Sequence, residues 1–139
     1  MPQSTFPRAG AGSPSGGDPA HLSILLVEDD DDIREAMAAF LEAEGYDVVQ
    51  AIDGDDALRK LRASSDRICL VLLDLFMPVK NGWEFRAEQM ADPAISAVPV
   101  IVVSADRNAR DKANTLGALE YLAKPVDFDR LLGTIATYC

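Results

Sequence analysis

Histidine and basic side chains are scarce in this 139-residue sequence, which has one histidine and 13 lysines and arginines against 23 acids. The histidine, His21, lies beside a Pro- and Gly-rich segment, so a hydrolase triad built on a histidine base is not expected. The formal net charge of -10 repels nucleic acid phosphates, and we expect no direct binding to DNA or RNA. The apolar runs have only the length of strands, so no membrane contact is expected. The N-terminus lacks the basic-then-apolar order of a secretory signal.

Cysteine is almost as rare, with Cys69 at the start of an apolar run and Cys139 as the last residue of the sequence. Two cysteines without motif spacing indicate neither a zinc site nor a disulfide framework. We therefore expect Cys69 to pack as a small hydrophobic side chain. A reducing cytosol is the simplest location for such a protein, which predicts a cytoplasmic protein.

The length predicts one domain. Residues 1–21 are rich in Pro, Gly, Ser and Ala and have no apolar period, which predicts a disordered N-terminal tail ahead of a folded domain at 22–139. Within that domain, apolar runs alternate with segments of helical periodicity. The expected strands are 23–28, 47–52, 69–74, 98–104 and 119–123, and the expected helices are 31–44, 54–63, 82–90, 107–116 and 128–137.

This alternation predicts a parallel sheet with helices on both faces and right-handed crossovers. The chain is too short for an eight-stranded barrel, which leaves an open (βα)5 sheet in a three-layer α/β/α sandwich. The order 2-1-3-4-5 is common for such sheets and is adopted by analogy. The expected inward positions are Ile33, Met37, Phe40 and Leu41 in the first helix and Ala57, Leu58 and Leu61 in the second.

Four of the apolar runs end in polar side chains, which are Glu28 with Asp29, then Asp74, Ser104 and Lys124. Ligands of open parallel sheets bind outside the carboxyl ends of the strands, so we expect these residues to lie close together. Carboxylates gathered in this way repel one another, and Mg²⁺ takes the oxygen ligands that they offer. A lysine ammonium pairs with a carboxylate or a phosphoryl oxygen. The pattern therefore predicts a site for a divalent cation and a phosphoryl group.

Each of these signals also has an ordinary structural interpretation. Acids stabilise the first turn of a helix, and we favour that role for Asp30–Asp32. A serine such as Ser104 often caps a helix, and a lysine such as Lys124 is often a solvated surface charge. Pro125 makes a cis Lys-Pro bond possible after the fifth strand.

Taken together, the motifs match a known family. They are Leu-Leu-Val-Glu-Asp-Asp at 25–30, Leu-Leu-Asp-Leu-Phe-Met-Pro-Val-Lys-Asn-Gly at 72–82, Val-Val-Ser-Ala at 102–105 and Lys-Pro at 124–125. In this order and spacing, the folded part of the chain resembles the receiver domain of two-component response regulators, the CheY-like group. The resemblance implies a flavodoxin-like, CheY-like fold with sheet order 2-1-3-4-5.

The resemblance also implies roles for individual residues. Asp74 would be the phosphoacceptor and would form an aspartyl phosphate. Mg²⁺, or Mn²⁺, would be held by Asp29, Asp74 and the backbone carbonyl of Phe76, with Glu28 acting mostly through a water. Lys124 and the hydroxyl of Ser104 would bind phosphoryl oxygens. Charge neutralisation and positioning of this kind are what phosphoryl transfer requires.

A conformational switch is implied as well, in which Ser104 moves towards the phosphate and Tyr121 turns inward behind it. The alternative for Tyr121 is a half-buried edge aromatic with its hydroxyl in water. Three residues depart from the commonest family pattern: Glu28 stands where aspartate is more usual, Ser104 replaces an equally common threonine, and Phe76 is bulky and apolar. We expect Phe76 to hinder water and to prolong the phosphorylated state.

The resemblance implies a signalling domain without turnover of an external substrate. Its partners would be a sensor histidine kinase or a histidine phosphotransfer protein and a downstream protein target. We expect a single-domain regulator without an output domain, either monomeric or dimerising on phosphorylation.

Three alternatives are open. A phosphatase of the haloacid-dehalogenase type would need an acid at the position of Phe76. A pseudo-receiver that only binds partners would not need Asp74, Asp29 and Lys124 together. A fragment of a larger hybrid kinase or regulator is the third alternative.

Overall fold

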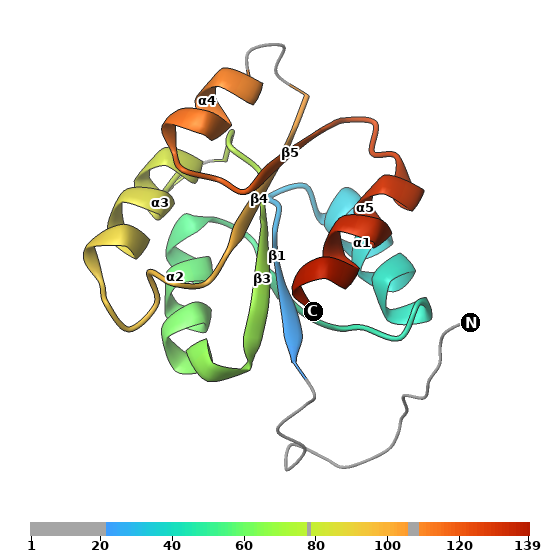
Figure 1. The fold of residues 1–139 in the computed structure, drawn as a ribbon, viewed down its shortest axis with the longest axis horizontal. Coiled ribbons are helices and arrows are strands. Elements are labelled where there is room, and N and C mark those ends of the chain that lie inside the picture. The colour runs from blue at the N-terminus through green and yellow to red at the C-terminus, as the bar shows by residue number, and fades with distance from the viewer. Residues whose placement is uncertain (1–21, 78, 106–108) are drawn as a thin grey trace.

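The computed structural model describes residues 22–77, 79–105 and 109–139, so the predicted tail at 1–21 lies outside the described residues. Five strand–helix repeats follow one another along the described chain (Figure 1). The strands are β1 (Ser23–Val27), β2 (Asp47–Ala51), β3 (Ile68–Leu73), β4 (Val100–Ser104) and β5 (Glu120–Ala123). The helices are α1 (Asp31–Ala43), α2 (Gly54–Ala63), α3 (Gly82–Ala91), α4 (Ala109–Thr115) and α5 (Phe128–Tyr138), with a 3-10 turn η2 (Ser65–Arg67) before β3.

The strands form one parallel sheet in the order β2-β1-β3-β4-β5, which confirms the predicted fold class and strand order. β3 lies at the centre, and all six of its residues are buried. A strand buried on both faces reads as a continuous apolar run, which is why Ile-Cys-Leu-Val-Leu-Leu shows no alternation. The carboxyl ends of all five strands therefore point to the same edge of the sheet.

Helices α1 and α5 cover one face of the sheet, and α2, α3 and α4 cover the other (Figure 1). The N-termini of α1, α2, α3 and α5 are each capped by an acid or amide side chain, which accepts a hydrogen bond from a backbone N–H of the first turn. Those caps are Asp30, Asp53, Asn81 and Asp127. None of the helices in the described part of the chain has the length and apolar character to cross a membrane.

The first helix turns a different face to the sheet than its apolar residues predict. Met37 and Leu41 are buried as expected, but Ile33 is 42% exposed and the neighbouring Arg34 is buried instead. The buried stripe thus runs through positions 34, 37, 38 and 41 of α1. Arg34 turns inward, and its guanidinium donates a hydrogen bond to the backbone carbonyl of Glu28. The expected inward residues of α2 are all buried.

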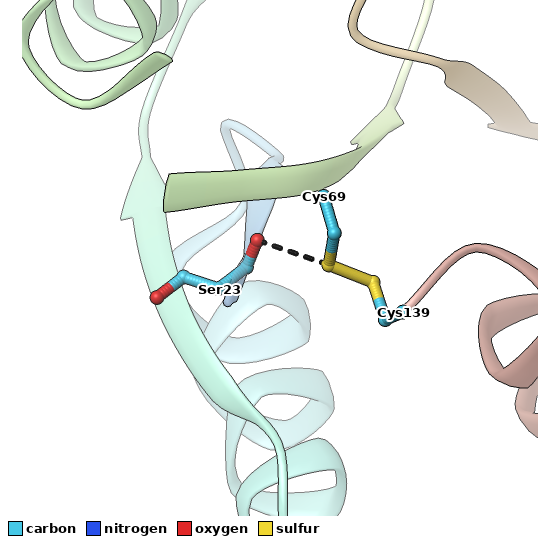
Figure 2. The surroundings of a disulfide bond; sticks show 3 residues. All are labelled: Ser23, Cys69 and Cys139. Atoms are coloured by element: carbon cyan, nitrogen blue, oxygen red, sulfur yellow. Dashed lines mark hydrogen bonds between the residues drawn. A yellow bond between two sulfur atoms is a disulfide. The ribbon is translucent and has the colours of Figure 1, made fainter. Parts of the chain in front are cut away.

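The expectation that Cys69 packs as an unbonded hydrophobic residue is wrong, because Cys69 and Cys139 form a disulfide (Figure 2). Ser23 of β1 pairs with Ile68 and the next residue, Ile24, pairs with Leu70, so Cys69 is the extra residue of a β-bulge. The bulge interrupts the alternation of side chains along β3 and directs Cys69 to the same face as Leu70, towards α5. The spacing of cysteines along the chain carries no trace of this local irregularity.

The disulfide joins the second residue of the central strand to the residue that follows the last helix. The two cysteines are 70 residues apart in the sequence, and their Cα atoms are 5.5 Å apart. Closing a loop of this length restricts the unfolded chain, and the chain-entropy relation gives about 4 kcal/mol of stabilisation. That amount is a large fraction of the net stability of a small domain. In the oxidised protein, the docking of α5 therefore depends on a covalent bond as well as on its apolar face.

Gly82 positions the loop that follows β3. It donates a backbone hydrogen bond to the carbonyl of Leu75 over 3.0 Å, and a Cβ at this position would lie 2.8 Å from both the Cα and Cδ2 of Leu75. It would also lie 3.0 Å from the backbone oxygen of Asp74. Glycine thus lets the start of α3 approach the backbone directly behind the end of β3.

We expect Gly82→Ala to lower the free energy of unfolding by about 1–3 kcal/mol, because the methyl group has no room beside Leu75. Urea denaturation measures the change. Gly133→Ala is the matched control, since a Cβ there meets no atom within 4 Å and the α5 interior gains up to about 1 kcal/mol from alanine. Equal effects of the two substitutions would contradict the close approach at Gly82.

Candidate phosphoryl and metal site

The site begins with the pairing of β1 and β3. Val27, the last residue of β1, is the register partner of Leu73, the last residue of β3. The backbone N–H of Asp74 continues this ladder by donating to the carbonyl of Val27 over 3.2 Å. The residues that follow the two strands, Glu28 and Asp74, therefore leave the sheet side by side, and Asp29 comes next on the β1 side.

The pairing of β4 and β5 brings the other polar residues to the same edge. Ser104 is the register partner of Ala123, and the backbone N–H of Lys124 donates to the carbonyl of Ser104 over 3.0 Å. Ser104 is fully buried at the end of β4, whereas Lys124 is partly exposed. The Lys124-Pro125 peptide bond is cis.

Three carboxyl groups form the acidic part of the site. One ligand oxygen from each of Glu28, Asp29 and Asp74 lies within 4.8 Å of the others, so together they could hold a metal ion. Glu28 and Asp74 are buried, and Asp29 is exposed. Partial desolvation and then a side-chain hydrogen bond with Glu28 raise the pKa of Asp29, because crowding disfavours its charged form. A cation between these oxygens would relieve that cost.

The ammonium of Lys124 is the counter-charge that the protein itself supplies. Its Nζ donates to Oε1 of Glu28 over 2.7 Å and lies 3.5 Å from Oδ2 of Asp74. Burial alone lowers the pKa of Lys124, but the hydrogen bond to Glu28 and the charge of Asp74 outweigh burial, and the pKa is raised. Lys124 therefore stays protonated and links two of the three acids.

Both oxygens of Glu28 are already engaged within the protein. Oε1 accepts from Lys124, and Oε2 accepts from the backbone N–H of Asp30 over 3.1 Å. Asp30 in turn caps α1 by accepting from the backbone N–H of Ile33, and Asp31 and Asp32 occupy the first turn of that helix. The helix-start interpretation of Asp30–Asp32 is thus confirmed.

Arg34 supports this corner of the site and was not identified from the sequence. Its guanidinium donates to the carbonyl of Glu28 over 2.9 Å, to Oε1 of Gln50 over 3.1 Å and to Oδ1 of Asp31 over 2.6 Å. It therefore ties the end of β1 to α1 and β2. A detectable signal was its place in the apolar stripe of the helix, three residues before Met37, where a charged residue is expected only if it is paired.

Phe76 and two residues not identified from the sequence form a group beside Asp74. The backbone N–H of Phe76 donates to Oδ1 of Asp74 over 3.3 Å, and its ring contacts Trp83 edge to face with centroids 5.3 Å apart. The ammonium of Lys112 lies 5.1 Å from the Phe76 ring and 5.5 Å from the Trp83 ring. The Phe76 side chain is still 51% exposed.

Tyr121 lies in β5 and is half-buried, with the Arg110 guanidinium 5.5 Å from its ring centroid. Its register partner in β4 is Val102, two residues before Ser104. The structure therefore brings Glu28, Asp29, Asp74 and Lys124 into one cluster, and it places Ser104 and Tyr121 in the adjoining strands.

The donor set fits a hard divalent cation. The available ligands are carboxylate oxygens, and three carboxyl groups carry more negative charge than one ammonium neutralises. Lys124 borders the same oxygens from β5, so an anionic group placed there would meet both a cation and an ammonium.

Comparison with known proteins agrees with this geometry. Residues 24–136 match the family model of the response regulator receiver domain. Protein PilH of Pseudomonas aeruginosa is 36% identical over 114 residues, which are 81% of this chain and 93% of that protein. The CAI-1 autoinducer sensor kinase/phosphatase CqsS of Vibrio cholerae is 36% identical over 118 residues, which are 83% of this chain and 17% of that protein.

Solved structures give the same result. The crystal structure of response regulator protein TrrA from Thermotoga maritima, in complex with Mg²⁺-BeF, superimposes with a TM-score of 0.75 at 30% sequence identity. The match covers 85% of this chain and 99% of that one. That structure contains Mg²⁺, the type of ion that the acidic cluster suits.

We expect Lys124→Met to lower the free energy of unfolding by about 2 kcal/mol in metal-free buffer, because buried Glu28 loses its counter-charge. Urea denaturation in the presence of a chelator measures the loss. Arg130→Met is the control: it breaks an ion pair with Glu120 in which both partners are exposed, and should cost less than about 1 kcal/mol. Equal losses in the two variants would show that the acids do not depend on the ammonium.

Proposed function

Because this chain belongs to the response regulator receiver family, we propose that it accepts a phosphoryl group on Asp74 and changes its protein contacts in response. The donor would be a phosphohistidine on a sensor histidine kinase or a histidine phosphotransfer protein. The observation that carries the proposal is the cluster of Glu28, Asp29, Asp74 and Lys124 at one edge of the sheet.

In the transfer, a carboxylate oxygen of Asp74 attacks phosphorus, and the bond between phosphorus and the imidazole nitrogen of the donor breaks. The electron pair of that bond stays with the imidazole, which is the leaving group. Asp74 suits this role because it is the acid at the end of the central strand, with Oδ1 held by the Phe76 N–H and Oδ2 facing Lys124. Its backbone is fixed by the hydrogen bond to Val27.

Asp29, Asp74 and the backbone carbonyl of Phe76 would hold Mg²⁺ or Mn²⁺, with Glu28 acting mostly through a water. Such a water-mediated role is supported by the two internal hydrogen bonds of the Glu28 carboxylate. The ion supplies neutralisation of the negative charge that gathers on the acids and the phosphoryl oxygens. Lys124 would exchange its bonds with Glu28 and Asp74 for a phosphoryl oxygen, and Ser104 would bind another through its hydroxyl.

The response would be a shift between two conformations of the face made by α4, β5 and α5. Ser104 would move towards the phosphate, and Tyr121 would turn inward from its half-buried position in β5. Phosphorylation can favour one of two existing states by adding local contacts that only that state makes. The equilibrium then selects which downstream protein binds.

Receiver domains are signalling domains rather than enzymes with an external substrate, and we propose that this chain turns none over. Its partners would be the histidine-containing donor and a protein target, with no direct contact to nucleic acid. It would act as a monomer or as a dimer formed on phosphorylation. PilH, of which the alignment covers 93%, supports a regulator made of the receiver domain alone.

Of the two alternatives to this proposal, one has support in a specific observation and the other does not. The alignment covers only 17% of the sensor kinase/phosphatase CqsS, which favours a receiver unit within a larger hybrid protein. A pseudo-receiver that binds partners without phosphorylation is disfavoured by the complete set of Asp29, Asp74 and Lys124. Both alternatives leave the fold unchanged. In the first, the phosphoryl group is accepted by a receiver within a larger protein, and in the second no phosphoryl group is accepted.

We expect the protein to gain the mass of one phosphoryl group when it is incubated with acetyl phosphate and Mg²⁺. Intact mass spectrometry measures the gain, which should be acid-stable for minutes, lost in hydroxylamine and absent without the metal. Asp74→Asn should gain nothing, because the amide is not a nucleophile of this kind. Asp66→Asn, in the 3-10 turn away from the cluster, is the control and should be phosphorylated like the parent. An unmodified parent protein would instead support the pseudo-receiver.

We expect Phe76→Asn to shorten the lifetime of the phosphorylated protein, because a polar side chain would admit and orient water where the aromatic ring excludes it. Loss of the phosphoryl mass after removal of the donor gives the rate. Phe128→Asn is a matched control, since Phe128 is also an exposed phenylalanine but lies at the start of α5 against Phe40. Equal lifetimes of Phe76→Asn and the parent would refute the shielding role.

A further inference from the structure

The bulge in β3 has the effect of presenting a cysteine to the last helix. In a regular strand, neighbouring side chains point to opposite faces, so Cys69 and Leu70 could not share a face. Here both belong to the core between the sheet, α1 and α5, while Ile68 and Val71 face the opposite side. The extra residue of the bulge is Cys69 itself. The irregularity is what directs its sulfur towards α5 (Figure 2).

Cys139 extends the face of α5 that packs on the sheet. Leu131 and Ile135 are fully buried on that helix, and Cys139 follows them at the same four-residue interval. Its backbone N–H donates to the carbonyl of Ile135 over 2.8 Å, which closes the last turn. Cys139 is nevertheless exposed, whereas Cys69 is 7% exposed. The pair therefore joins a residue on the surface to a buried residue.

The structure also contains a hydrogen-bond acceptor for the reduced Cys69 thiol. The sulfur of Cys69 lies 3.4 Å from the backbone carbonyl of Ser23 in β1 (Figure 2). A disulfide sulfur has no proton to donate, so this carbonyl becomes a hydrogen-bond acceptor for Cys69 only when the thiol forms. Burying a thiol beside such an acceptor costs little free energy. Breaking the disulfide therefore leaves no polar group at Cys69 without a hydrogen-bond partner.

We propose that Cys69 and Cys139 are a reversible thiol–disulfide exchange site whose reactants are low-molecular-weight disulfides and thiols, and that its oxidation state determines whether the last turn of α5 is held to β3. Cys139, the exposed residue of the pair, is the point of entry, and the buried Cys69 is the resolving partner. This site does not rest on the proposed phosphoacceptor function, because it uses none of the residues at the carboxyl edge.

Oxidation proceeds in two exchanges with glutathione disulfide. The Cys139 thiolate attacks one sulfur of glutathione disulfide, and the bond between the two glutathione sulfurs breaks with release of one glutathione thiolate. The Cys69 thiolate then attacks the Cys139 sulfur of the mixed disulfide and releases the second glutathione. The protein loses two electrons and two protons, and glutathione disulfide becomes two glutathione molecules. Reduction is the reverse sequence, with glutathione attacking at Cys139.

The exchange site and the candidate phosphoryl site lie at opposite ends of the same strand. Cys69 is the second residue of β3 and Asp74 directly follows the last, so five residue steps of extended strand separate them by about 16 Å. A change at Cys139 should therefore alter the order of the end of α5 while phosphoryl transfer to Asp74 is retained. This difference separates the proposal from a general loss of structure.

The test equilibrates the full chain with mixtures of reduced and oxidised glutathione, blocks free thiols with an alkylating reagent and measures the intact mass. We expect a transition between a doubly alkylated and an unalkylated monomer that follows the square of the reduced glutathione concentration divided by the concentration of glutathione disulfide. Hydrogen exchange of the segment 136–139 should be about tenfold or more faster in the reduced form, because the last turn loses its covalent attachment. The β4 segment should exchange equally in both forms.

Two variants complete the design. Cys139→Ser removes the exposed cysteine and should give last-turn exchange like that of the reduced parent at every glutathione ratio. Cys69→Ala removes the buried cysteine and should accumulate the mixed disulfide with glutathione at Cys139, which the parent resolves. Uptake of phosphoryl mass from acetyl phosphate should be unchanged in both variants.

Three outcomes would overturn the proposal. They are two free thiols at every glutathione ratio, a disulfide that persists in a large excess of reduced glutathione, and equal exchange of the last turn in both redox forms. Failure of phosphorylation with a normal redox transition would instead count against the proposed function alone.

Discussion

The parallel pairing of β1 with β3 is the constraint on which the candidate site depends. It sets Val27 beside Leu73, and the next residues, Glu28 and Asp74, leave the sheet as neighbours. Two buried acids so close together are unfavourable unless positive charge is near. Lys124, delivered from β5 on the far side of β4, is the residue that meets this need. The strand pairing thus brings two negative charges together, and the position of β5 places a positive charge beside them.

The acidic cluster is only partly neutralised by the protein. Lys124 links Glu28 and Asp74, and Arg34 holds the backbone of Glu28 from α1, but the pKa of Asp29 remains raised. A site with excess negative charge is ready to bind a divalent cation, and a bound cation would in turn favour an incoming anionic group. In the proposed function, the same ammonium would be a structural partner at rest and a phosphoryl ligand during transfer.

β3 carries different chemistry at its two ends. Its carboxyl end leads to Asp74 and the loop held by Gly82, and its amino end carries the bulge that turns Cys69 towards α5. Because α5 is also part of the face assigned to the proposed switch, the oxidation state at one end of β3 and phosphorylation at the other would act on the same helix by separate routes. The rigid, fully buried strand between them keeps the two chemistries apart.

Residue order alone was sufficient for the fold class, the alternation of elements and the acid, hydroxyl and lysine at the strand ends. Buried parallel strands leave short apolar runs, and functional side chains must follow them at one edge of the sheet. The group of Phe76, Trp83 and Lys112 and the Cys69–Cys139 disulfide were decided only in three dimensions. Each depends on contacts between distant segments or on a one-residue bulge, and neither leaves a periodic signal in the sequence.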